Sequence, residues 1–196
     1  MLIVLLVLTN LAPADAHPTR FDVTREAAGY RIDASADIEA DESVVWNTLT
    51  DYPTLPQFVP GIRSVRVLEK HEEAGKERLL VEQSGELRFL FFSRRVSVLL
   101  DVEQQPRTRV DARARPRPPG ADDDRTGLDQ FEGTYTLVPI PGGTRLGYRA
   151  HFIPGFSLPP ILGPLVVRRT MQAQFEAMLA EIDRRRTGSP PPAPAR

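Results

Sequence analysis

The chain has 196 residues, of which 41% are hydrophobic and 26% charged, a composition typical of one globular domain with its own core. Its 25 basic and 26 acidic residues give a formal net charge of −1, so it lacks the basic excess of a bulk nucleic-acid binder. It contains no cysteine, which excludes disulfides, thiol catalysis, cysteine metal ligands and a lipidated cysteine anchor.

The first 16 residues predict a secretory signal peptide. Residues 1–12 are dominated by Leu, Ile and Val but are too short to span a membrane comfortably, and Ala14-Asp15-Ala16 supplies the small residues that a signal peptidase accepts. We therefore expect an exported protein, periplasmic or secreted, whose mature chain begins with a lead-in over 17–29. No Lys or Arg precedes the apolar run, so an uncleaved membrane tether or a misassigned start codon remains an alternative.

A strand and two short helices are expected next. Residues 30–38 alternate between apolar and polar side chains, which is the period of a half-buried strand. Asp41 can cap a helix over 42–50. Three apolar side chains of that helix are expected in the core: Val45, Trp46 and Leu49. A second short helix is expected over 55–59.

Four strands are then expected, over 64–70, 77–84, 88–102 and 108–116. The third opens with the consecutive apolar residues Phe89-Leu90-Phe91-Phe92. Such a run indicates burial on both faces of the strand or a bulge.

The strand over 108–116 has two contrasting faces. One carries Asp111 and five arginines: Arg107, Arg109, Arg113, Arg115 and Arg117. It is interpreted as a solvated outer face, or alternatively as a patch for an anionic ligand, membrane phosphates or another protein. The opposite face carries small residues, which would leave space inside the fold: Thr108, Val110, Ala112 and Ala114.

Metal and cofactor sites are not expected. Asp122, Asp123 and Asp124 are adjacent, but neighbouring residues of an extended loop point in different directions, and charge runs are usually solvated. The three histidines have no metal-binding spacing, and no convincing acid–base pair is visible.

A hairpin follows, with strands over 129–139 and 144–153 joined by a Pro-Gly-Gly turn. Its inward faces are expected to carry Phe131, Gly133, Tyr135 and Leu137, and Leu146, Tyr148, Ala150 and Phe152. The apolar loop over 154–162 comes next, and exposed apolar loops usually have a role. We expect a gate or membrane contact there, formed by Phe156, Leu158 and Ile161.

The longest helical pattern runs over 164–184. Its apolar side chains recur at three- and four-residue steps and share one face: Val167, Met171, Phe175, Met178 and Ile182. Arginines at 184–186 suit the negative end of the helix dipole. Because most of the preceding chain is expected to be strand, this helix should lie along a curved antiparallel sheet in an α+β fold. The tail over 187–196 is rich in Pro and Ala and is expected to be disordered.

Two stretches carry a family resemblance. Residues 36–52 form a strand, an acidic turn, Val45-Trp46 and a closing Asp51-Tyr52, and residues 55–68 continue with Leu-Pro-Gln-Phe-Val-Pro-Gly-Ile and Val-Arg-Val-Leu. The pattern resembles the START-like helix-grip superfamily (SRPBCC), and is most similar to its polyketide cyclase/dehydrase and coenzyme Q-binding branch. The resemblance covers about 30–185 and implies a domain over 30–186, in which about seven antiparallel strands grip the last helix around an apolar cavity.

We therefore expect a protein that binds a hydrophobic small molecule, such as an isoprenoid quinone or lipid, without a cofactor. The expected cavity lining is Trp46, Phe58, Val110, Ala112, Phe131, Tyr135, Tyr148, Phe152, Met171, Phe175 and Met178. Two alternatives stay open. One is a polyketide cyclase or dehydratase that uses tyrosine hydroxyls, and the other is a protein-interaction domain that uses the arginine face. The sequence does not indicate an oligomeric state.

Overall fold

The computed structural model describes residues 19–89, 92–115, 127–156, 158 and 163–189. Its elements, in chain order, are β1 (Thr19–Glu26), β2 (Gly29–Ile38), α1 (Glu42–Thr50), the 3-10 turn η1 (Tyr52–Thr54), α2 (Leu55–Phe58), β3 (Ile62–Glu73), β4 (Lys76–Phe89), β5 (Phe92–Gln105), β6 (Arg109–Ala114), β7 (Leu128–Ile140), β8 (Gly143–Pro154) and α3 (Gly163–Thr187).

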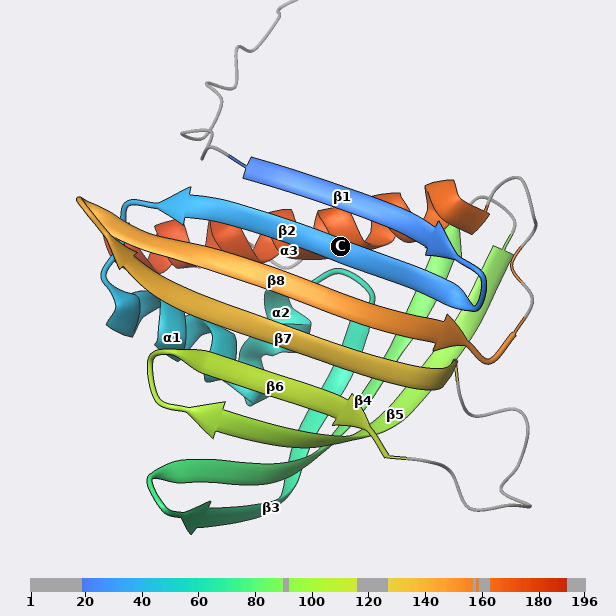
Figure 1. The fold of residues 1–196 in the computed structure, drawn as a ribbon, viewed down its shortest axis with the longest axis horizontal. Helices are drawn as coiled ribbons and strands as arrows, with labels where there is room; N and C mark the ends of the chain where they lie inside the picture. Colours follow the sequence, from blue (N-terminus) through green and yellow to red (C-terminus); the bar gives the residue numbers. More distant parts are fainter. Residues whose placement is uncertain (1–18, 90–91, 116–126, 157, 159–162, 190–196) are drawn as a thin grey trace, which may run out of the picture.

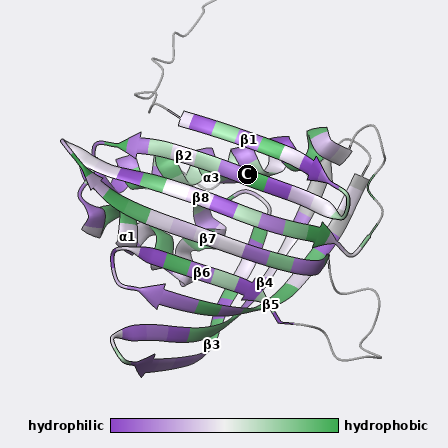
Figure 2. Ribbon diagram, in the orientation of Figure 1, coloured by the Kyte–Doolittle hydropathy of each residue, from purple (hydrophilic) through white to green (hydrophobic). Residues whose placement is uncertain are grey.

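The eight strands form one sheet in the order β1-β2-β8-β7-β6-β5-β4-β3, and every neighbouring pair is antiparallel. The sheet curves, and α1, α2 and α3 all lie on one side of it (Figure 1). This arrangement confirms the expected α+β helix-grip architecture. Green and purple residues alternate along many of the strands in Figure 2, because one face of the sheet is buried and the other is solvated.

The eighth strand is β1, which lies within the segment treated above as a lead-in. It pairs with β2 from Thr19↔Ala36 to Glu26↔Gly29. Its two apolar side chains, Phe21 and Val23, turn toward the core, and both are half-buried. Two apolar residues in an edge strand give a weak alternation signal, so the pattern did not predict a strand here.

The prediction of one strand over 88–102 is wrong, because β4 continues to Phe89 and β5 begins only at Phe92. The two strands stay paired up to Phe89↔Phe92. Gly85 lies inside β4, where a Cβ atom would come within 2.4 Å of the Gly61 carbonyl oxygen. This glycine therefore permits a close approach of the α2–β3 turn and does not end the strand.

Helix α1 has the predicted bounds, but its buried face differs in part. Val45 and Leu49 are buried as expected, whereas Trp46 is only half-buried. Thr48 is as fully buried as Val45, and its hydroxyl donates to the Val44 carbonyl oxygen at 2.8 Å. Asp41 occupies the N-cap position with extended backbone, but its side chain makes no capping hydrogen bond.

Helix α3 buries the predicted stripe against the sheet and α1. Val167, Phe175, Met178 and Ile182 are buried, and Met171 is half-buried. No helix in the described part of the chain is long and apolar enough to cross a membrane.

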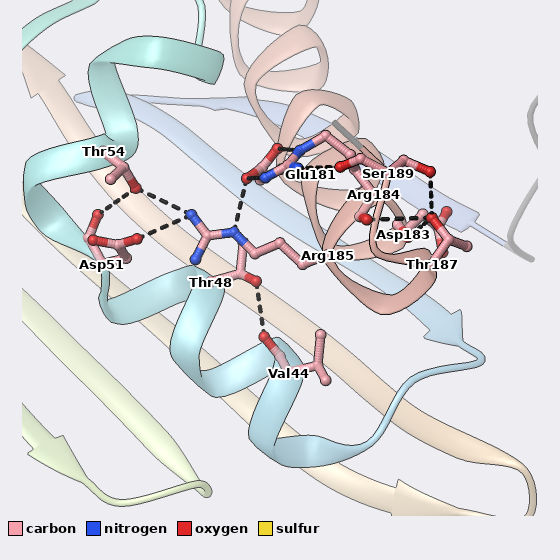
Figure 3. Close-up of polar contacts among 10 residues, drawn as sticks. All are labelled: Val44, Thr48, Asp51, Thr54, Glu181, Asp183, Arg184, Arg185, Thr187 and Ser189. Atoms are coloured by element: carbon pink, nitrogen blue, oxygen red, sulfur yellow. Dashed lines mark hydrogen bonds and ion pairs between the residues drawn. The ribbon is translucent and has the colours of Figure 1, made fainter. Parts of the chain in front are cut away.

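Arg185 joins the C-terminal end of α3 to the α1–α2 segment and is itself held by a buried carboxylate, which the apolar pattern did not reveal (Figure 3). Glu181 is only 5% exposed and accepts hydrogen bonds from Arg184 and Arg185, each at 2.7 Å. Arg185 also donates to Asp51 at 3.0 Å and to the Thr54 hydroxyl at 3.1 Å. Two of the arginines assigned above to the helix dipole thus have a specific partner, and the network fixes α3 beside η1.

We expect Glu181→Gln to lower the free energy of unfolding by about 1–3 kcal/mol at neutral pH, because it leaves two partly buried guanidinium groups without their carboxylate. Urea unfolding measures the change. The matched control is Glu176→Gln on the exposed side of α3, which should change stability by less than about 0.5 kcal/mol.

The wild type and Glu181→Gln also test whether the negative charge of Glu181 is the source of this stability. The hydrogen bonds from Arg184 and then Arg185 hold the pKa of Glu181 below its ordinary value of 4.5, against the opposing effect of burial. Its contribution is therefore present above pH 4.5 and is lost as the pH falls through the lower folded-state pKa. The stability gap between the wild type and Glu181→Gln should close on acidification, and a gap that does not change with pH would contradict this assignment.

Candidate ligand-binding site

A cavity of about 280 Å³ lies between α3 and the concave face of the sheet. Its lining comes from α1, η1, α2, strands β3 to β8, α3 and the segment after β8. Most of the lining residues are aliphatic or aromatic, so the space suits an apolar guest.

The cavity exists because the facing side chains are too short to fill it. Val110 and Ala112 of β6 and Gly133 of β7 line the sheet side, with Ala112 paired to Gly133. Met171 and Met178 of α3 also line the cavity. Methionine adapts to irregular apolar shapes, so it can border a hollow without a fixed packing partner. Of the small inward face predicted for this strand, Val110 and Ala112 lie at the cavity, Ala114 packs against the core outside its lining, and Thr108 lies in the exposed turn before β6.

The structure brings many of the predicted lining residues together and leaves three out. Those that border the cavity are Val110, Ala112, Phe131, Tyr135, Tyr148, Phe152, Met171 and Met178. Trp46 and Phe58 are instead partly buried against the core, and Phe58 packs under the Arg185 guanidinium at 5.9 Å. Phe175 is buried to 2% exposure between Phe21 and Tyr148. A ligand-binding role for the bordering residues stays a prediction.

The predicted gate falls only partly within the described residues. Phe156 and Leu158 line the cavity. Ile161 and the aspartates at 122–124 lie outside the described residues. On the opposite side, the α2–β3 turn is held by the Gln174 amide, which donates to the Pro60 carbonyl oxygen at 3.0 Å, and by the Glu86 N–H, which donates to the Gly61 carbonyl oxygen at 2.7 Å.

A polar pair that was not predicted from the sequence lies at the cavity wall. Tyr52 of η1 lines the cavity, and its hydroxyl oxygen accepts a hydrogen bond from the Gln104 amide at 2.6 Å. Gln104 is only 3% exposed and lies in β5 beyond the end predicted for that strand. Burial raises the pKa of Tyr52 to about 12, although the hydrogen bond from Gln104 acts in the opposite direction.

Two further tyrosines stack inside the cavity. The rings of Tyr135 and Tyr148 are 4.4 Å apart and nearly parallel, at 22°. Burial raises the pKa of both hydroxyls, and for Tyr135 the neighbouring Tyr148 adds to the effect. Both therefore remain neutral phenols, which can donate a hydrogen bond but are poor bases.

The charged side chain that lines the cavity is bound by other side chains of the protein. Glu86, the charged side chain among the described lining residues, is bound by Arg63 and by the Ser93 hydroxyl, the latter at 2.6 Å. No cluster of three or more His, Asp or Glu side chains suited to a metal ion occurs in the described ranges.

Arginines on the outer face of β6 are paired with carboxylates. Arg109 pairs with Asp111 at 2.6 Å, Arg113 with Glu132 at 3.7 Å and Arg115 with Asp101 at 2.5 Å. These pairs are exposed and are therefore worth little stability individually. They neutralise the face locally, which fits the interpretation of a solvated outer surface.

Comparisons with known proteins agree with this geometry. Residues 30–185 match the sequence profile of the family described as polyketide cyclase / dehydrase and lipid transport. No curated protein matches the chain.

Solved structures that share the fold include the following three. A STAR-related lipid transfer protein from Xanthomonas axonopodis is 18% identical, with a TM-score of 0.60 over 83% of this chain and 98% of its own. The Zhui aromatase/cyclase from Streptomyces sp. R1128 is 18% identical, with a TM-score of 0.59 over 82% and 98%. A START superfamily protein from Mycobacterium smegmatis is 14% identical, with a TM-score of 0.55 over 79% and 97%.

The tyrosine environments predict an unusual titration. Since the pKa values of Tyr135 and Tyr148 lie above the ordinary value of 10.0, neither ring should ionise near pH 10 in the folded protein. The double variant Tyr135→Phe/Tyr148→Phe should therefore show the same rise in phenolate absorbance through pH 10 as the wild type. In guanidinium chloride the variant should lose the signal of two tyrosines. A smaller native signal in the variant would show that these rings ionise normally.

Proposed function

The chain belongs to the polyketide cyclase/dehydrase and lipid transport family, and we propose that it binds a hydrophobic small molecule, such as an isoprenoid quinone or a lipid, in the cavity under α3. The observation that carries this proposal is the apolar hollow itself. Burial of apolar surface contributes about 25 cal/mol per Å², so a guest is held without covalent chemistry.

The cavity volume limits what fits. At about 280 Å³ it lies just below the usual range for ligand pockets, roughly 300–1,000 Å³. It accommodates a ring system or part of a chain, and we place the exit of a longer chain beside Phe156 and Leu158, which line the cavity. We assign the gate to residues 154–162, because the facing α2–β3 turn is bonded to both α3 and β4.

A cyclase or dehydratase is the second candidate, because neutral tyrosine hydroxyls lie inside the cavity and could supply a proton. The described lining offers no base to act with them, since its one carboxylate is bound by Arg63 and Ser93. Turnover of a polyketide-like substrate that Tyr135→Phe or Tyr148→Phe abolishes, with binding nearly intact, would favour the enzyme. Loss of affinity alone would favour the binder.

Export forms part of the proposal. The apolar residues 1–12 and the following Ala14-Asp15-Ala16 support a cleaved signal and a periplasmic or secreted binder, and a retained segment would tether the domain to a membrane. Cell fractionation with N-terminal sequencing of the mature chain distinguishes the two, and a cytosolic, uncleaved chain would refute export.

Filling the cavity should abolish binding without unfolding the protein. We expect Ala112→Phe to weaken the affinity for the neutral dye Nile red at least about tenfold, since the added ring projects into the cavity that Ala112 lines. The free energy of unfolding should change by less than about 1.5 kcal/mol, because the ring enters a void. Fluorescence titration and urea unfolding measure the two effects.

The matched control is Ala173→Phe, which adds the same ring on the exposed side of α3 and should leave dye binding unchanged. Equal dye affinity in the wild type and Ala112→Phe would refute binding in this cavity.

A further inference from the structure

A row of aromatic rings crosses the interior and ends at Tyr135. Phe21 of β1 contacts Phe175 of α3 at 6.0 Å, Phe175 stacks on Tyr148 of β8 at 6.5 Å, and Tyr148 stacks on Tyr135 of β7 at 4.4 Å. Among the described residues, Tyr148 is the one ring stacked on Tyr135. The row therefore ends at a tyrosine that lines the cavity.

The other face of Tyr135 looks toward β6, where the side chains are short. The residue directly opposite is Val110, and the next inward residue is Ala112. Neither is long enough to cover a tyrosine ring beyond its base. The Phe131 ring lies over Gly133, with its Cζ atom 2.8 Å from the position that a Cβ would take. The open space beside Tyr135 is therefore on the side of Val110 and Ala112, which line the cavity with it. Stacked rings are worth more than the apolar area that they bury.

The same two tyrosines offer unused hydrogen-bond donors. Neither the Tyr135 nor the Tyr148 hydroxyl has a hydrogen-bond partner among the described residues. Both rings are enclosed by the protein yet keep accessible surface, which borders the cavity. An unpaired hydroxyl in an apolar site is costly, so a guest that supplies an acceptor oxygen is favoured over one that does not.

We propose that Tyr135 and Tyr148 form a recognition site for a flat ring that carries a hydrogen-bond acceptor oxygen, such as a ring carbonyl. The ring stacks on the free face of Tyr135 as the next member of the aromatic row. The oxygen accepts a hydrogen bond from a tyrosine hydroxyl. This inference rests on the proposed function and narrows it, because it names the chemistry that selects one hydrophobic guest over another.

The test uses three probes of equal carbon count that compete with Nile red. Menadione is flat and has ring carbonyls, methylnaphthalene is flat and has none, and methyl nonyl ketone has a carbonyl but no ring. Menadione reacts with thiols, but this chain has no cysteine and so cannot form that adduct. Affinities are measured for the wild type, for Tyr135→Phe/Tyr148→Phe and for Tyr135→Leu.

The double phenylalanine variant keeps both rings and removes only the hydroxyls. It should bind menadione about three- to tenfold more weakly, which is the usual net effect of one neutral hydrogen bond, and methylnaphthalene as well as the wild type does. Tyr135→Leu should weaken both flat probes and leave methyl nonyl ketone less affected. The matched control is Tyr30→Phe, because Tyr30 is a buried tyrosine stacked on Phe152 that does not border the cavity. It should leave all three affinities unchanged.

The outcomes separate this inference from the proposed function. A double variant that loses affinity equally for menadione and methylnaphthalene, or for neither, overturns the recognition site while the cavity remains a binding site. Failure of every probe and of Nile red to bind the wild type overturns the proposed function itself.

Discussion

The structure depends on a mismatch in side-chain length between two facing surfaces. Over much of the sheet, inward residues pack with the helices in a continuous core. At β6 and β7 the inward residues include Val110, Ala112 and Gly133. The residues of α3 that line the same cavity include Met171 and Met178. Side chains this short cannot close the space while the flanking strands hold α3 at its distance. The cavity is therefore a consequence of sequence, and the binding proposal follows from it.

Helix α3 both lines the cavity and holds the fold together. Its cavity-lining residues extend from Val167 to Met178, and core residues such as Phe175 lie among them. The Glu181 network that joins α3 to the α1–α2 segment lies beyond this stretch, toward the C-terminal end of the helix. The anchor of α3 is therefore separate from the residues that border the cavity.

Local periodicity predicted the parts of the fold in which one face is clearly apolar. The bounds of α1, the β7–β8 hairpin and the stripe on α3 follow from alternation and from three- and four-residue steps. β1 was missed because it buries little, and the β4–β5 boundary was misplaced because the apolar run at 89–92 spans a hairpin. Most of the residues predicted to line the cavity border it in the structure. Glu181 and the Tyr52–Gln104 pair were not found, because each depends on partners distant in sequence.

Native mass spectrometry of the purified full chain tests the central claim most directly. The account predicts that the intact protein carries one apolar small molecule, taken up during expression or after incubation with a hydrophobic extract. Extraction with organic solvent should remove this molecule and restore the mass of the bare chain. A bare chain under every condition, with no uptake from any hydrophobic extract, would contradict the account.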